Sequence, residues 1–139
     1  MFTNLNFWAI LVSGLVYWIL GGIWYAAVFS KPWQEAIGYF AMNEAEKAKV
    51  QKDFPKALAA HFLSGLITSV ILAKVVSAMG ATSFIEGLLY GALMWLAFAF
   101  TIHLNSLMFE KRPKPVFSIN SGFYLIAFAV IGGILTVWR

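Results

Sequence analysis

The sequence predicts an all-α integral membrane protein with four transmembrane helices and short interfacial or cytoplasmic helices between the first and the second. Hydrophobic residues make up 61% of the 139-residue chain and charged residues only 12%, against about 45–50% and about 25% in soluble domains. A soluble protein of this length has too high a surface-to-volume ratio to hide so much apolar surface. Four apolar segments also have the roughly 20 residues that a helix needs to cross a bilayer.

The expected spans form one membrane domain over residues 1–139, and in chain order they are residues 7–29, 57–79, 83–109 and 117–138. The first and fourth contain no charged residue, whereas the second contains Lys74 and the third contains Glu86. Helix is required because lipid cannot satisfy backbone polar groups. The alternation typical of barrel strands is missing from these segments.

Only the connection between the first two spans is long, and we expect a cytoplasmic helical loop over about residues 31–55. Pro32 to Phe40 is expected to be a short helix in the headgroup zone. A second helix is expected to start at Asn43, because Glu46 follows three residues later as in a capping box. Pro55 then precedes the second span, since proline favours helix boundaries.

The distribution of Lys and Arg predicts the orientation of the chain. The first and third loops together hold eight basic residues, and the other side of the membrane holds only Lys74 and Arg139. The positive-inside rule then places both loops in the cytoplasm and both termini outside. We therefore expect a cell-membrane protein, in bacteria one of the inner membrane.

Several short strings occur in a specific order along nearly the whole chain: Gly21-Gly22-Ile23-Trp24-Tyr25, Lys31-Pro32-Trp33, Gly80-Ala81-Thr82, Glu86-Gly87, Asn105-Ser106-Leu107-Met108-Phe109-Glu110, Ile119-Asn120-Ser121-Gly122-Phe123-Tyr124 and Trp138-Arg139. In these strings the sequence resembles the small bacterial membrane-protein family called domain of unknown function 1761. The resemblance implies a four-helix membrane protein and implies no activity.

Polar residues at membrane depth are candidates for function because their burial in lipid is costly. Counting from the turn between the third and fourth spans and from Pro55 places polar groups from all four helices in a common inner layer. Its candidates for a ligand site or pathway are His61, Asn105, Asn120, Tyr124, Trp24 and Tyr25. The layer is interpreted either as hydrogen-bonding glue between helices or as a ligand pocket or hydrated path.

Lys74 and Glu86 lie six residues before and six residues after Gly80, at the centre of the turn between the second and third spans. In an antiparallel hairpin they share a depth, so an intramembrane ion pair is one hypothesis. The alternatives are that both side chains extend to the interface, or that they have a functional role.

Small residues one turn apart let membrane helices approach closely. Gly87 and Gly91 form such a pair in the third span, and Gly65 and Ser69 form one in the second. They are expected to serve packing within one chain or self-association between copies.

Several classes of function have no support in the sequence. The chain has no cysteine, which excludes thiolate catalysis and cysteine-based metal sites. No nucleophile, acid–base pair or phosphate loop indicates an enzyme. We predict no metal, because His61, His103 and Glu110 lack a recognised ligand spacing. No cofactor and no nucleic-acid partner is expected; the partner is the lipid bilayer.

Two hypotheses for function remain. The favoured one is a homo-oligomeric channel- or transporter-like protein for a small solute or ion, because nearly the whole chain is membrane-embedded and polar groups lie inside the spans. The alternative is a non-catalytic binding or scaffold protein for a lipid, a quinone-like molecule or a partner membrane protein. Its support is the aromatic-rich first helix and the small number of buried charges.

Overall fold

The computed structural model describes residues 5–139, and 86% of these residues are helical. No strand occurs among the described residues. The elements, in chain order, are α1 (Phe7–Gly22), the π-helix η1 (Ile23–Val28), α2 (Ser30–Ala36), the 3-10 helix η2 (Tyr39–Ala41), α3 (Glu44–Ala78), α4 (Phe84–Met94), the π-helix η3 (Trp95–Phe100), α5 (Thr101–Met108) and α6 (Lys114–Val137).

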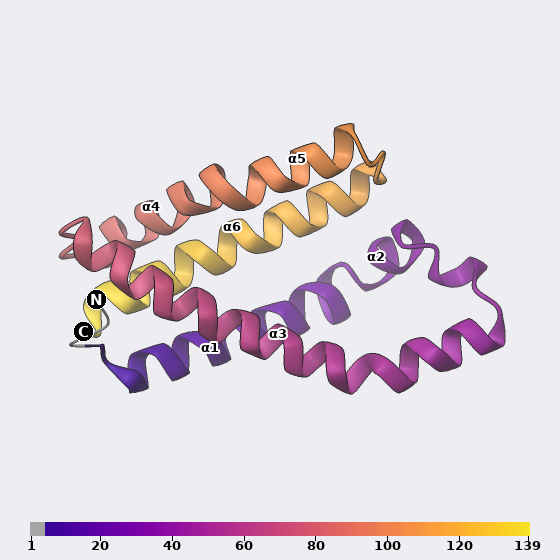
Figure 1. Cartoon of the computed structure of the whole chain (residues 1–139), viewed down its shortest axis with the longest axis horizontal. Helices are drawn as coiled ribbons and strands as arrows, with labels where there is room; N and C mark the ends of the chain where they lie inside the picture. The colour runs from indigo at the N-terminus through magenta and orange to yellow at the C-terminus, as the bar shows by residue number, and fades with distance from the viewer. Residues whose placement is uncertain (1–4) are drawn as a thin grey trace.

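Four continuous helices are long and apolar enough to cross a membrane: Phe7–Val28, Glu44–Ala78, Phe84–Met108 and Lys114–Val137. Two of these are composite, because η1 continues α1 and η3 joins α4 to α5. The start of α1 and the C-terminus lie at the same end of the molecule as the α3–α4 turn, and α2 and the α5–α6 turn lie at the opposite end (Figure 1). Four spans that alternate in direction require this arrangement.

The boundary expected at Pro55 is wrong. Pro55 lies inside α3, which runs without interruption for 35 residues from Glu44. The predicted cytoplasmic helix and the second span are therefore one helix. Proline removes one backbone hydrogen bond from a helix, and Pro55 lies in an exposed part of α3, with Phe54 and Lys56 also exposed.

Side-chain caps define where three helices begin. The side chain of Asn6 accepts hydrogen bonds from the backbone N–H groups of Trp8 and Ala9 at the start of α1. The capping box of Asn43 with Glu46 is present at the start of α3, as the sequence predicted. Ser83 and Glu86 form a second capping box at the start of α4, which the sequence analysis missed although the Ser-x-x-Glu spacing is its signature.

The helices α4 and α6 approach so closely that their backbones are in contact. A Cβ added to Gly87 would collide with the Gly132 carbonyl, and one added to Gly91 would collide with the Phe128 carbonyl and lie 3.0 Å from the Cα atom of Ala129. The helices α1 and α3 use the same device, since a Cβ on Gly65 would lie 3.0 Å from the carbonyl oxygen of Gly14.

Both small-residue pairs therefore pack within one chain. Gly65, Ser69, Gly87 and Gly91 are all buried against neighbouring helices. The surfaces through which the sequence allowed self-association are thus already occupied. Self-association between copies stays a prediction.

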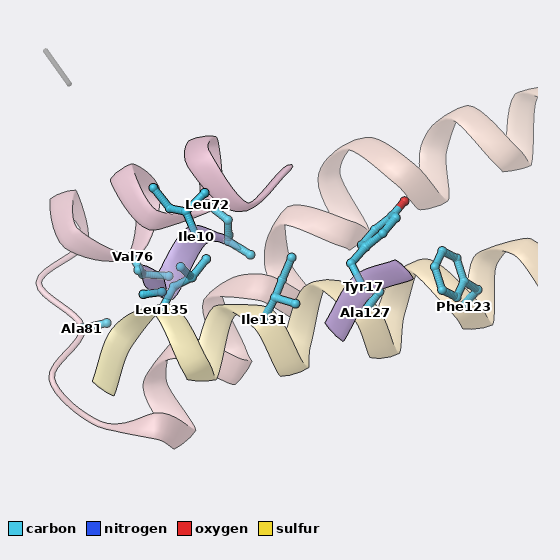
Figure 2. Packing of buried hydrophobic residues seen from close by; sticks show 10 residues of the cluster. Ile10, Tyr17, Leu72, Val76, Ala81, Phe123, Ala127, Ile131 and Leu135 are labelled. Carbon is cyan, nitrogen blue, oxygen red and sulfur yellow. The ribbon is translucent and has the colours of Figure 1, made fainter. Parts of the chain in front are cut away.

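The buried core runs along α6 and is thickest near the start of α1 and the end of α6. Figure 2 shows Leu72, Val76, Leu135 and Ile10 gathered there, and Ile131 and Ala127 continuing along α6 toward Tyr17 and Phe123. Toward the opposite end α1 and α3 diverge (Figure 1), and this divergence creates the space for the site described next.

Candidate functional site

Two π-helical segments bring aromatic donors to the same stretch of α6. In η1, the Trp24 indole donates to the Ile119 carbonyl oxygen at 2.9 Å, and the Tyr25 hydroxyl donates to Asn120 Oδ1 at 2.6 Å. In η3, the Trp95 indole donates to the Ser121 carbonyl oxygen at 2.8 Å. Three consecutive residues of α6 are therefore held from both sides. π-Helical turns are rare and are frequently found at functional sites.

These contacts show which side chains join the helices. Ser64, Thr101 and Ser118 donate to carbonyls of their own helices four residues earlier, and this bonding uses the one proton that each hydroxyl can donate. The interhelical hydrogen bonds come instead from Trp and Tyr side chains, including Trp18, which donates to the Leu58 carbonyl at 3.1 Å. The predicted hydrogen bonding between helices exists at Tyr25 and Asn120, whereas the Ser and Thr side chains among residues 5–139 make no such bond between spans.

A large cavity opens where α1 and α3 diverge. Its volume is about 870 Å³. The wall is mostly apolar and aromatic, and its lining residues are Trp18, Ile19, Gly21, Gly22, Tyr25, Ala26, Ser30, Trp33, Gln34, Ile37, Tyr39, Val50, Gln51, Phe54, Ala57, Leu58 and His61. We call it the aromatic cavity. None of its lining residues is Asp, Glu, Lys or Arg.

The inner end of the aromatic cavity is built around His61. Its ring lies 4.9 Å from the Tyr17 ring and 5.5 Å from the Phe123 ring, centroid to centroid. The Nε2 atom is buried against Gly21 and has no hydrogen-bond partner among the described residues. A buried polar atom without a partner is destabilising, so this histidine is held in place by packing rather than by polar contacts.

Tyr25 connects the aromatic cavity to the rest of the predicted layer. Its ring packs against Trp33 at 4.8 Å and Phe123 at 5.4 Å, and its hydroxyl reaches Asn120. Tyr124 lies behind Phe123, with ring centroids 5.1 Å apart. The structure thus brings together five predicted site residues, namely Trp24, Tyr25, His61, Asn120 and Tyr124.

Asn105 is the exception. It is exposed on α5, and the side chains that face α6 at this level are His103 and Ser106. The physical reason is η3. A π-helical turn holds one residue more than an α-helical turn, and each residue rotates the chain by about 100°. The helix face that packs against α6 at Gly87 and Gly91 therefore continues through His103 and Ser106. Asn105 points outward, so the placement of Asn105 in the inner layer is wrong.

His103 and Ser106 line a second, smaller cavity of about 230 Å³ together with Arg112, Val116, Phe117 and Asn120. We call it the polar pocket. His103 stacks on Tyr124 with ring centroids 5.3 Å apart. Asn120 borders the polar pocket and Tyr25 borders the aromatic cavity, so their hydrogen bond forms part of the wall between the two.

The carboxylate of Glu86 is used at the start of α4. Its Oε2 atom accepts from the Thr82 backbone N–H at 2.6 Å, the Thr82 hydroxyl at 3.0 Å and the Ser83 N–H at 3.1 Å. Lys74 lines a cavity of about 50 Å³ beside Asn6 and Arg139. The capping role accounts for the acidic residue in this position, and the ion pair between Lys74 and Glu86 stays a prediction.

Metal ligands do not gather in the part of the chain that the structure describes, where no group of three His, Cys, Asp or Glu side chains could hold an ion. His61 lines the aromatic cavity, whereas His103 lines the polar pocket. The two histidines therefore belong to separate sites.

Comparison with known proteins identifies the family of the chain. No curated protein and no solved structure matches the chain. The family model described as "Protein of unknown function (DUF1761)" matches residues 8–136, which is nearly the whole chain. The protein therefore belongs to the DUF1761 family, as the order of its short sequence strings indicated.

Proposed function

We propose that this protein spans the cell membrane and binds an uncharged amphiphile, a lipid or quinone-like molecule, in the aromatic cavity. The aromatic cavity is the observation that carries the proposal. Its volume of about 870 Å³ falls in the range of about 300–1,000 Å³ typical of small-molecule sites. Such sites are mostly apolar with a few polar groups that orient the ligand, as this one is.

The composition of the wall indicates the ligand class. Trp18, Phe54 and Leu58 supply apolar surface, while Gln34 and Gln51 supply amides that bond to nothing else among the described residues. No charged residue lines the cavity, and an ionised ligand there would have no counter-charge. A neutral head with carbonyl or hydroxyl oxygens fits this lining.

The outer surface supports insertion in lipid. Along α3, Leu63, Ile67 and Ile71 are 57%, 56% and 51% exposed, and α4 carries similar residues on its outer face. Water would disfavour such continuous apolar stripes, whereas lipid accommodates them. The orientation that we propose places α2 and the α5–α6 turn in the cytoplasm, because eight of the ten basic residues lie within residues 31–56 and 111–114, toward that end. Transport would require several copies of the chain, and the geometry of one chain favours binding.

The proposal can be tested by filling the cavity. Gly22 lines it, and a Cβ added there would meet no atom within 4 Å. Gly22→Phe should therefore fill part of the cavity without disturbing the helices. The probe is a benzoquinone with a ten-carbon tail, whose binding is followed through quenching of tryptophan fluorescence in uncharged detergent.

We expect saturable quenching in the parent protein and at least a tenfold weaker affinity in Gly22→Phe. Ala97→Phe is the matched control, because Ala97 is exposed on η3 and lines neither the aromatic cavity nor the polar pocket. Equal affinities in both variants would refute a site in this cavity. Ion or solute flux through proteoliposomes that Gly22→Phe leaves unchanged would favour the transport hypothesis instead.

A further inference from the structure

We infer that the polar pocket between α5 and α6 is a second binding site and that it takes a phosphate group. The pocket is separate from the aromatic cavity, and its lining chemistry is different. Four of its six lining side chains are polar, namely His103, Ser106, Arg112 and Asn120. Its volume of about 230 Å³ suits a headgroup rather than a whole lipid.

Arg112 supplies the charge. Its guanidinium carries five N–H donors, and only Nε is engaged, with Glu110 Oε2 at 3.2 Å. Its two terminal amino groups have no acceptor among the described residues. The forked geometry of arginine matches phosphate oxygens, which it can bind in a bidentate manner.

Glu110 fixes the position of the Arg112 guanidinium and does not occupy the amino groups that would bind the ligand. One carboxylate oxygen accepts from Arg112 Nε, and the other accepts from the Ser106 hydroxyl at 3.2 Å. The carboxylate is thus occupied on both sides. It binds the guanidinium through Nε and leaves the two terminal amino groups available to a ligand.

The backbone also directs Arg112 toward the pocket. Lys111 has a φ of 54°, which makes it the one non-glycine residue with positive φ among those described. This left-handed residue turns the chain back after α5, and the Arg112 N–H reaches the Ser106 carbonyl at 3.2 Å. Left-handed geometry at a non-glycine residue is costly and is found at ligand-binding sites.

The local charge favours an anion. Lys111, Arg112 and Lys114 contribute three positive charges within four residues, and Glu110 contributes one negative charge. The C-terminal end of α5 and the N-terminal end of α6 meet at the pocket, and their helix dipoles have opposite signs there and largely cancel. The charged side chains therefore determine the sign of the local electrostatic potential. Basic residues beside a span attract anionic lipids, and a free phosphate has the same chemistry.

The test compares three probes with the Gly22→Phe variant, in which the aromatic cavity is partly filled so that an uncharged lipid cannot bind there. Binding in uncharged detergent is measured by native mass spectrometry and titration calorimetry. The probes are dihexanoyl phosphatidic acid, dihexanoylglycerol, which differs only in lacking the phosphate, and inorganic phosphate. We expect phosphatidic acid to bind at least tenfold more tightly than dihexanoylglycerol. Inorganic phosphate that binds as tightly as phosphatidic acid would identify a free anion as the source, and much weaker binding would identify a lipid headgroup.

Two variants that each lose one positive charge separate the pocket from general surface attraction. Arg112→Gln should weaken phosphatidic acid binding at least tenfold, whereas Lys114→Gln, at a position that does not line the pocket, should weaken it less than threefold. Equal losses in both variants, equal binding of the two lipids or no binding of any probe would overturn the assignment. Circular dichroism confirms that each variant is folded, and Gly22→Phe should leave phosphatidic acid binding unchanged.

Discussion

The adjacent glycines Gly21 and Gly22 permit a sharp test of how the aromatic cavity is built. A Cβ on Gly21 would collide with the His61 ring at Nε2, whereas a Cβ on Gly22 would meet nothing within 4 Å. The His61 ring cannot easily move away, because Tyr17 and Phe123 lie 4.9 Å and 5.5 Å from it. Gly21→Ala should therefore disturb the packing, and Gly22→Ala should not.

The magnitude follows from two opposing effects. Replacing glycine by alanine inside a helix stabilises it by up to about 1 kcal/mol, and both variants share this gain. Overpacking costs about 1–3 kcal/mol, and only Gly21→Ala carries this cost. The difference in the free energy of unfolding between the two variants should therefore be about 1–3 kcal/mol, with Gly22→Ala the more stable.

The assay is unfolding of the purified protein in detergent, followed by circular dichroism at increasing denaturant concentration. Removing the ring supplies the control, because Gly21→Ala should cost nothing further in a His61→Ala background. A double-mutant cycle should then give a coupling of about 1–3 kcal/mol between the two positions. Equal stabilities of Gly21→Ala and Gly22→Ala, or a coupling near zero, would refute this packing of His61 against α1.

Four other substitutions test separate parts of the structure by the same unfolding assay. Gly91→Ala should lower the free energy of unfolding by about 1–3 kcal/mol, because the added Cβ meets the backbone of α6 rather than a side chain. A stability equal to that of the parent protein would contradict the close α4–α6 contact. Tyr25→Phe should lower the free energy of unfolding by about 0.6 kcal/mol and at most about 1.7 kcal/mol, because it loses the hydrogen bond to Asn120. Asn105→Ala, at an exposed position, should change it by less than about 0.5 kcal/mol. A larger loss of stability in Asn105→Ala than in Tyr25→Phe would place Asn105 in the inner layer. Ser83→Ala should cost about 0.5–2 kcal/mol because it removes the acceptor for the Glu86 N–H, and no change would show that the start of α4 does not depend on this cap.

The outcome at α5 shows where analysis of the sequence loses accuracy. Counting residues from the turn placed Asn105 and Asn120 at one depth along the helices. Depth alone does not state which way a side chain points. The π-helical turn of η3 rotates α5, so that His103 and Ser106 face α6 while Asn105 faces outward. No pattern in the residues Trp95–Phe100 announces such a turn.

Glu86 gives the opposite case, because its environment could have been predicted. Ser83 precedes it by three residues, and this spacing is the signature of a capping box. Because Glu86 lies inside an apolar segment, it was interpreted as a charged residue buried in the membrane instead. In the structure the Glu86 carboxylate accepts hydrogen bonds from the backbone N–H groups of Thr82 and Ser83, and this capping role explains an acidic residue at this position.

The sequence by itself determined the helical class, the four apolar segments and the family, because these depend on composition and on length along the chain. It also identified Trp24, Tyr25, His61, Asn120 and Tyr124, which lie at one level. Only the tertiary structure decided which faces of the helices meet, how α1 and α3 diverge into the aromatic cavity and how Arg112 turns back over the polar pocket. These features depend on helix rotation and on contacts between distant segments, which no local pattern specifies.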